Sequence, residues 1–344
     1  MDKIVVLDFG SQYSHLICRR IREFSVYAEL VPYDISYEEL QKHNPKGIIF
    51  SGGPSSVYNS DAPIPENKIF DMNLPLLGIC YGHQLIVNKY GGKIKKANKE
   101  YGSSLLTIDD DKDLLSGVGE SVRAWMSHGD EAEEIPPGFK VIGHTESAKA
   151  AAIASEEKSI YGIQFHPEVV HTEQGTEILK NFVLKICGAK QDWTMEGFID
   201  TVVEKISKIE GNVLCGVSGG IDSTVAALLI HKAIGDKLTC IFVNNGLLRL
   251  NEETEIEEMF KDNFKLNFTA VDAADEFLEK LKGVEDPEKK RKIVGEEFIR
   301  VFTEFSEKNG PFKWLAQGTL YPDVIESGVS KGPASVIKSH HNVG

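Results

Sequence analysis

Residues 74–92, LPLLGICYGHQLIVNKYGG, pass from a short apolar run into an amphipathic run through two glycines that flank a cysteine. The apolar run predicts a buried strand, and the run after Cys80 predicts a helix. Gly78 and Gly82 have the spacing of a nucleophile elbow, in which the backbone turns sharply and presents the central side chain. The macrodipole at the amino end of a helix would favour a thiolate. A purely structural cysteine is the alternative, because free cysteines are often buried.

The segments on either side repeat this pattern of an apolar run followed by a helix. Apolar runs at 4–10, 28–35 and 47–53 alternate with helical stretches, a βαβ rhythm that predicts a mainly parallel sheet covered on both faces. From about residue 92 to 154 the pattern is that of successive strands, and residues 175–188 predict a helix.

Length and a lapse in periodicity indicate two domains. The chain has 344 residues, more than one core usually supports. Periodicity lapses at 188–193 (GAKQDW), and a new series of strand, glycine loop, helix and strand follows. We therefore predict an α/β protein of two domains, each with a mainly parallel sheet flanked by helices. The domains would be residues 1–187 and 194–344, with 188–193 as the linker.

Composition narrows the classes of function. The net charge of −14 comes with no basic block, which argues against a nucleic-acid-binding protein. No apolar run approaches the roughly 20 residues that span a bilayer, so we expect no membrane segment. The five cysteines are scattered, with no C-x-x-C, which favours a reducing compartment, the cytoplasm, and no zinc site.

A candidate base for Cys80 follows much later in the chain. The run FHPEV (165–169) places His166 and Glu168 at the end of an apolar strand. His166 can take the thiol proton and pass it to a leaving amine, while Glu168 orients the imidazole and stabilises its charged form. These three residues are the predicted catalytic triad.

The motif SGGP (51–54) follows another apolar strand and could supply donors to an oxyanion. We expect the N–H groups of Gly53 and Tyr81 to form this oxyanion hole, with a simple turn as the alternative for SGGP. Together, SGGP, GICYGHQ and HPE resemble the class I glutamine amidotransferases in order and approximate spacing. The resemblance covers residues 1 to about 187.

This resemblance implies a reaction for the first domain. In the family the cysteine attacks the side-chain amide of glutamine, ammonia leaves, and water hydrolyses the glutamyl thioester. Gln84 matches a position that helps to bind the substrate glutamine, and MSHGD (126–130) resembles a segment near the same pocket.

The run SGGIDST (218–224) lies between a predicted strand and an apolar helix, which is the setting of a phosphate-binding loop. It lacks the Walker lysine but offers hydroxyls, glycine N–H groups and a helix amino end, all suited to pyrophosphate. The carboxylate of Asp222 indicates a bridging Mg²⁺. An N-capped helix after a glycine turn is the alternative, but it explains neither both glycines nor both hydroxyls. The predicted residues that bind ATP and pyrophosphate are Ser218, Gly219, Gly220, Asp222, Ser223 and Thr224.

The loop resembles that of the N-type ATP pyrophosphatases, which cleave ATP between the α and β phosphates and adenylate a carbonyl oxygen. Segments 242–249, 286–298, 314–327 and 336–344 resemble the glutamine-hydrolysing GMP synthetase family, and the likeness covers the whole chain. It implies a carbon–nitrogen ligase with glutamine as amido donor. XMP, ATP, glutamine and water would give GMP, AMP, pyrophosphate and glutamate, with ammonia passed directly between the two activities.

The same resemblance assigns roles to single residues. Asp222 matches a ligand of Mg²⁺ and pyrophosphate, and Lys338 matches a pyrophosphate-binding lysine. Asp323 and Glu326 match acidic residues near the XMP and ATP site. Residues 284–295 match a mobile lid, for which a solvated surface segment is the alternative.

Two features leave alternatives open. The family usually has Asp where this chain has Asn244, which weakens any role of that position in ATP binding. The sequence ends at Gly344 within a motif that continues in the family, so we expect a fragment that hydrolyses glutamine slowly, makes little GMP and lacks the family's carboxyl-terminal homodimer contact. The alternative functions are another ammonia-using adenylating synthetase, for example one acting on a nicotinate-containing substrate, and a glutaminase or regulatory partner with an incomplete synthetase half.

Overall fold

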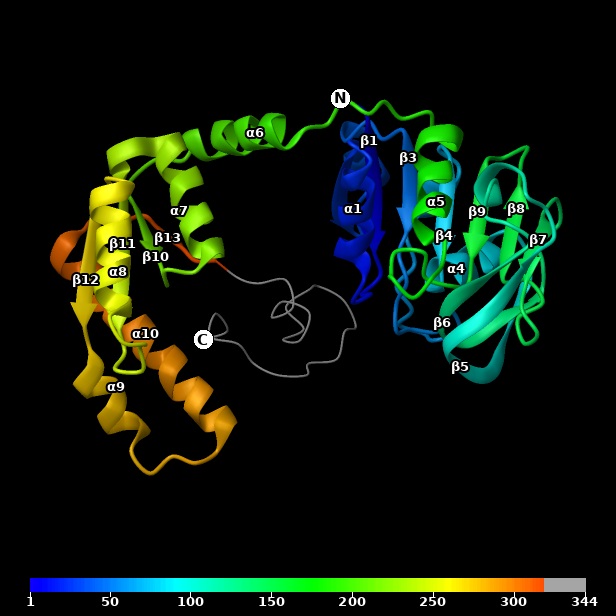
Figure 1. Ribbon diagram of the computed structural model, residues 1–344. Helices are drawn as coiled ribbons and strands as arrows, with labels where there is room; N and C mark the ends of the chain where they lie inside the picture. The colour runs from blue at the N-terminus through cyan, green and yellow to red at the C-terminus, as the bar shows by residue number, and fades with distance from the viewer. Residues whose placement is uncertain (319–344) are drawn as a thin grey trace. The chain divides into compact units, whose positions relative to one another are not determined.

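The computed structural model describes residues 1–318, apart from the side chains of residues 97–99. These residues form two compact units, one of Met1–Thr194 and one that begins at Met195. Each unit carries its own sheet (Figure 1). Residues 187–194 lie in no helix or strand. Within the described part of the chain, no helix combines the length and apolar character needed to cross a membrane.

The first unit is built on a nine-stranded sheet in the order β2-β1-β3-β4-β9-β8-β7-β5-β6. The first five strands in that order are parallel, as the βαβ rhythm predicts, and the others join by antiparallel pairing. The strands are β1 (Lys3–Asp8), β2 (Tyr27–Pro32), β3 (Gly47–Phe50), β4 (Leu76–Ile79), β5 (Lys93–Ile108), β6 (Ser121–Glu134), β7 (Lys140–His144), β8 (Ala152–Ser155) and β9 (Ile160–Ile163).

Helices cover both faces of this sheet, and each face has its own buried core. Ile4 and Val6 of β1 belong to one core, whereas Val5 and Leu7 belong to the other, because successive side chains of a strand point to opposite faces. The helical segments are α1 (Ser14–Glu23), α2 (Tyr37–Lys42), α3 (Asn67–Phe70), α4 (Tyr81–Lys89), η1 (Asp113–Leu115), and α5 (Gly175–Lys180) with its π-helical continuation η2 (Asn181–Ile186).

The second unit is built on a four-stranded parallel sheet in the order β12-β11-β10-β13. Cys215 and Cys240 point into one core and Leu214 and Ile241 into the other, so this sheet is also buried on both faces. Its elements are α6 (Met195–Ser207), β10 (Val213–Gly216), α7 (Ile221–Ile234), η3 (Gly235–Lys237), β11 (Leu238–Asn244), α8 (Glu252–Glu258), η4 (Met259–Asn263), β12 (Phe268–Asp272), α9 (Ala274–Leu281), α10 (Pro287–Asn309) and β13 (Trp314–Ala316). The predicted fold class, two α/β domains with mainly parallel sheets, is confirmed.

The segment expected to be a lid or a solvated surface stretch is mostly helical. Helix α10 begins at Pro287, and the carboxylate of Asp286 caps it by accepting a hydrogen bond from the N–H of Lys289 at 2.8 Å. Proline is favoured at the first helical position, where its missing N–H costs nothing. The charged residues 289–292 are exposed, as in a solvated surface segment. The lid assignment stays a prediction.

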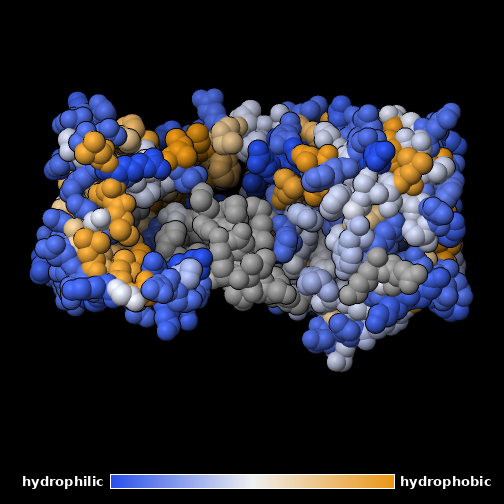
Figure 2. Space-filling view, turned by 60° about the horizontal axis from the view of Figure 1, so that its bottom comes forward, coloured by the Kyte–Doolittle hydropathy of each residue, from blue (hydrophilic) through white to orange (hydrophobic). Residues whose placement is uncertain are grey.

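The surface of the described residues is mainly polar on one face. On the face seen in Figure 2, hydrophilic residues predominate and hydrophobic ones form separate areas. Exposed apolar side chains include Ile221 and Leu250 in the second unit and Val170 in the first.

Candidate active sites

Cys80 lies on a sharp turn between β4 and α4, with backbone angles φ 53° and ψ −104°. Both flanking glycines are required there by close backbone contacts. A Cβ atom at Gly78 would lie 2.4 Å from the carbonyl oxygen of Gly82, and one at Gly82 would lie 2.5 Å from the carbonyl oxygen of Phe50. The strained φ of a non-glycine residue thus places the thiol at the amino end of a helix, which is the geometry of a nucleophile elbow.

His166 and Glu168 follow β9, the parallel neighbour of β4, so they lie at the same edge of the sheet as Cys80. The imidazole Nδ1 of His166 is 2.8 Å from Oε1 of Glu168. Two backbone contacts hold the histidine: its N–H donates to the carbonyl of Trp125 at 3.0 Å, and the hydroxyl of Thr172 donates to its carbonyl at 2.6 Å. The structure therefore brings the three predicted triad residues together.

The electrostatics of this triad favour a protonated imidazole. Burial alone would lower the pKa of His166, because an imidazolium is costly away from water. The Glu168 carboxylate and the Cys80 sulfur outweigh this effect of burial, and together they hold the pKa of His166 well above its ordinary value. Since Glu168 is fully buried, little solvent screens this interaction.

A short network of amides surrounds the Cys80 sulfur. The thiol donates to the carbonyl of Ser127 at 3.4 Å, which places the MSHGD segment beside the nucleophile. The amide of Gln164 donates to the sulfur at 3.7 Å. Gln84 is buried next to this group and donates to the carbonyl of Asp130 at 2.8 Å.

Of the predicted oxyanion donors, the N–H of Tyr81 belongs to the residue directly after Cys80. Tyr81 is the first residue of α4, so its N–H has no acceptor within the helix. In the SGGP loop, a Cβ atom at Gly52 would come within 3.0 Å of Cε1 of His166 and 3.6 Å of Cβ of Cys80. Gly52 therefore lies at the wall of the site, beside His166 and Cys80. The N–H of Gly53 belongs to the peptide unit that follows the Cα atom of Gly52.

In the second unit, residues 217–220 join β10 to α7 and form a compact loop. Gly219 has φ +76°, and a Cβ atom there would lie 2.5 Å from Cγ1 of Ile256, so this position requires glycine. The hydroxyls of Ser223 and Thr224 both donate to the carbonyl of Gly220, at 3.1 and 2.9 Å. Ser218 contacts the Ser223 hydroxyl through both its N–H and its own hydroxyl. These bonds fix the loop on the first turn of the helix.

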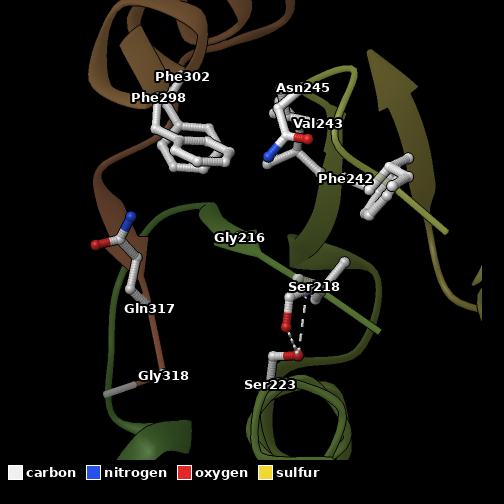
Figure 3. A pocket seen from close by; sticks show the side chains of 13 residues that line it. Gly216, Ser218, Ser223, Phe242, Val243, Asn245, Phe298, Phe302, Gln317 and Gly318 are labelled. Carbon is white, nitrogen blue, oxygen red and sulfur yellow. Dashed lines mark hydrogen bonds between the residues drawn. The ribbon is translucent and has the colours of Figure 1, made fainter. Parts of the chain in front are cut away.

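A cavity of about 190 Å³, open to solvent, lies beside this loop (Figure 3). The loop and the carboxyl ends of β10 and β11 form one part of its lining, and the rings of Phe298 and Phe302 from α10 form another. Gln317 and Gly318 also line it. The cavity therefore pairs phosphate-binding chemistry with an apolar wall that suits a flat heterocycle.

Asp222 lies in the first turn of α7, with its side chain exposed. Within residues 1–318, no group of three or more His, Cys, Asp and Glu side chains is placed to hold a metal ion. A single carboxylate beside a phosphate-binding loop still fits Mg²⁺, which takes few protein ligands and is completed by phosphate oxygens and water. The predicted residues Lys338, Asp323 and Glu326 lie outside the described residues.

Asn244, the departure from the family pattern, ends β11 and has two partners. Its Oδ1 accepts from the N–H of Gly246 at 3.0 Å, which an aspartate could also do. Its Nδ2 donates to Oε2 of Glu253 at 2.8 Å, which an aspartate could not do. The amide thus avoids a pair of carboxylates at this edge of the sheet.

Comparisons with known proteins match a different family to each part of the chain. Residues 5–186 match the family of class-I glutamine amidotransferases, and residues 193–298 match the NAD synthase family. A crystal structure described as that of a GMP synthase subunit from Thermoplasma acidophilum is 31% identical, with a TM-score of 0.51, and the match covers 55% of this chain and 94% of that chain.

The fold and the two sites define a glutamine amidotransferase joined to an ATP-using synthetase. The curated relatives identify which one. The chain is 55% identical to the glutamine-hydrolysing GMP synthase of Caldicellulosiruptor saccharolyticus over 99% of this chain and 67% of that protein. It is 53% identical to the same enzyme of Bacillus cereus over 100% of this chain and 67% of that protein. The chain belongs to the glutamine-hydrolysing GMP synthase family, which consists of carbon–nitrogen ligases that make GMP with glutamine as amido donor.

Two residues of the first site escaped prediction from the sequence. Gln164 contacts Cys80 and Thr172 contacts His166, but neither belongs to a motif that the sequence singles out. Only the position of Gln164 could have indicated its role. It lies two residues before His166, and alternate residues of an extended segment point to the same face, so its side chain points to the same face as that of His166.

Proposed function

We propose that Cys80, His166 and Glu168 carry out the glutaminase half of GMP synthesis. The Cys80 sulfur attacks the side-chain carbonyl carbon of glutamine, and the carbon–nitrogen bond breaks as His166 gives its proton to the leaving nitrogen, which departs as ammonia. Water, deprotonated by His166, then hydrolyses the thioester to glutamate and restores the thiol. The close contact of His166 with Glu168 supports this assignment, because it fixes the ring and stabilises its charged form.

The N–H groups of Gly53 and Tyr81 serve in this proposal as donors to the oxyanion formed on the glutamine carbonyl. Gln84 binds substrate glutamine. Its side chain is buried and held by the Asp130 carbonyl, so little conformational freedom remains to be lost when glutamine binds.

In the second half, the loop Ser218–Thr224 binds the pyrophosphate portion of ATP, and the cavity beside it accepts the adenine. The oxo group of XMP that becomes the amino group of GMP attacks the α phosphorus, and pyrophosphate leaves. Ammonia then adds to the activated carbon, and AMP departs with the original oxygen. Each bond that forms is matched by one that breaks. ATP supplies the AMP leaving group, and glutamine supplies the nitrogen.

Asp222 is the residue that would hold Mg²⁺. When bound, the ion supplies positive charge that stabilises the departing pyrophosphate. Ser223 and Thr224 act mainly by closing the loop, because their hydroxyls already donate to Gly220. The N–H and the hydroxyl of Ser218 are likewise engaged with the Ser223 hydroxyl. The N–H groups at the start of α7 are then the donors that face phosphate.

The triad at the elbow is the observation that carries this proposal, and Cys80→Ala tests it. We expect glutamine hydrolysis to fall by at least about 1,000-fold, because the covalent step disappears. The unfolding midpoint should change little. Ammonia-dependent adenylation of XMP, measured as AMP release, should be unaffected. Glutamine hydrolysis within a few-fold of the unmodified chain would contradict the assignment. A cytoplasmic location and a homodimer stay predictions.

A further inference from the structure

Gln164 is a buried side chain at the glutaminase site to which the proposed mechanism gives no role. It follows β9 directly, two residues before His166, and is 1% exposed. Its backbone is fixed, since its N–H donates to the carbonyl of Ala151 at 2.8 Å. The side-chain amide lies between Gln84 and Cys80.

A chain of hydrogen bonds determines which way this amide points. The carbonyl oxygen of Asp130 can only accept, so the group of Gln84 that faces it at 2.8 Å must be the NH₂. The same NH₂ faces Gln164 at 3.5 Å, which requires the oxygen of the Gln164 amide on that side. The NH₂ of Gln164 is therefore directed at the Cys80 sulfur, 3.7 Å away.

We propose that Gln164 is a further catalytic residue, whose N–H stabilises the Cys80 thiolate and the sulfur that leaves when the thioester is hydrolysed. This inference rests on the proposed glutaminase role of Cys80.

The surroundings of the sulfur explain why such a donor is needed. The Ser127 carbonyl lies 3.4 Å from Sγ and accepts a hydrogen bond from the neutral thiol. Once the proton has moved to His166, the same carbonyl dipole faces a negative sulfur and repels it. An N–H from Gln164 on the thiolate compensates, and hydrogen bonds to ionised groups are the stronger kind. Because Cys80 is only 4% exposed, water cannot do the same work.

A purely structural role for Gln164 makes a different prediction. If the amide served only to hold Gln84, its loss would weaken glutamine binding and raise KM. The thiolate would not be affected. The direct bond of Gln84 to Asp130, at 2.8 Å, is shorter than its 3.5 Å contact with Gln164. We therefore expect kcat to change more than KM.

The test measures alkylation of Cys80 by iodoacetamide between pH 5 and 9, with the modified residue mapped by peptide mass. Burial raises the pKa of the other four thiols, to about 11 for Cys215 and about 12 for Cys18 and Cys240. Those thiols therefore stay protonated and unreactive in this range. The variants are Gln164→Met, which removes the donor at similar volume, and Gln164→Glu, which replaces the donor with a negative acceptor. Gln164→Asn is the conservative third variant, and Gln41→Glu, on the exposed surface of α2, is the matched control.

We expect the pH midpoint of alkylation to rise by about one unit in Gln164→Met, which makes the reaction about tenfold slower at pH values below both midpoints, and to rise by more in Gln164→Glu. The Gln41→Glu control should match the unmodified chain, and in Gln164→Met kcat for glutamine should fall about tenfold with KM within about twofold. Unmoved midpoints in folded Gln164 variants, with only KM raised, would overturn this inference alone. Glutamine turnover that survives Cys80→Ala would remove the proposed function and this inference with it.

Discussion

Replacing Glu168 with Gln tests how much of the glutaminase rate depends on one buried charge. Glutamine has nearly the same shape as glutamate, so the substitution removes the charge and leaves the packing. The Oε1 atom that contacts His166 at 2.8 Å can be replaced by a neutral amide oxygen. The other carboxylate oxygen, Oε2, is buried without a hydrogen-bond partner among the described residues, so nothing there fixes the orientation of an introduced amide.

The size of the effect follows from the charge separation. Two unit charges about 4 Å apart interact by about 4 kcal/mol at an effective dielectric constant of about 20. In Glu168→Gln, a neutral hydrogen bond to His166 would recover about 1 kcal/mol of this interaction energy. The net loss of about 3 kcal/mol lowers the pKa of His166 by roughly two units, at about 1.4 kcal/mol per unit. A similar loss in the transition state corresponds to a kcat lower by roughly 100-fold.

The direction of the pH dependence is also determined. The active form of the Cys80–His166 pair has its shared proton on the imidazole, from which ammonia takes it. The basic limb of kcat/KM reports the loss of that proton, so a lower pKa of His166 moves this limb to lower pH. A flipped amide that donates to Nδ1 would select the wrong tautomer and add to the loss.

The assay follows glutamate release between pH 5.5 and 9.5, with His166→Ala as the control that removes the acid and base altogether. We expect His166→Ala to be more severe than Glu168→Gln, because the amide still orients the ring in part. If Glu168→Gln kept a kcat within threefold of the unmodified chain and an unmoved basic limb, the charge of Glu168 would have no catalytic role.

Three further predictions concern the second unit. Asp222→Asn should reduce Mg²⁺-dependent pyrophosphate release from ATP by at least about tenfold, because one carboxylate that would hold the metal is lost. Thioester formation at Cys80 should be unchanged. Normal pyrophosphate release in this variant would mean that the loop has another role. Gly219→Ala should destabilise the unit by about 1–2 kcal/mol, through its positive φ and its contact with Ile256, measured by urea unfolding; an unchanged midpoint would show that the loop adapts. Asn244→Asp should place a carboxylate against Glu253 and raise the pKa of one of the pair above its unfolded value, so that stability falls above about pH 4 and returns on acidification. The double variant Asn244→Asp/Glu253→Gln should restore the unfolding midpoint at pH 7, and failure to do so would mean that the pair is not the cause.

The sequence was a good guide wherever a single segment contains the whole geometric cause. The elbow at Cys80 could be predicted because Gly78 and Gly82 lie on either side of it in one short segment, at the point where α4 begins. The cap of α10 was equally local, since Asp286 precedes Pro287 at the spacing of an N-cap and first helical residue. This N-cap signal was present in the sequence, but the charged composition of the segment led to the prediction of a lid or a solvated surface segment instead of a helix.

Contacts between distant segments could not be predicted in this way. Gln164 reaches Cys80 across 84 positions and Gln84 across 80, through the pairing of β9 with β4. No pattern in a single chain specifies which residues at the ends of two neighbouring strands meet. The partner of Asn244 is only nine positions away, but it depends on how α8 packs after β11.

The two proposed active sites use the same strand–turn–helix arrangement for different purposes. The identity of the turn residue with positive φ decides whether the turn presents a side chain or leaves the backbone open. Both lie where a parallel strand ends, a tight turn follows and a helix begins, so both place helix N–H groups at the carboxyl edge of a sheet. In the first unit the residue with positive φ is Cys80 itself, at 53°, and the strain is accepted because the turn must present a side chain. In the second unit it is Gly219, at 76°, which has no side chain to present and leaves the backbone open to an anion. The proposed thiol nucleophile and the proposed phosphate-binding loop therefore differ, at this level, by whether the turn residue with positive φ carries a side chain.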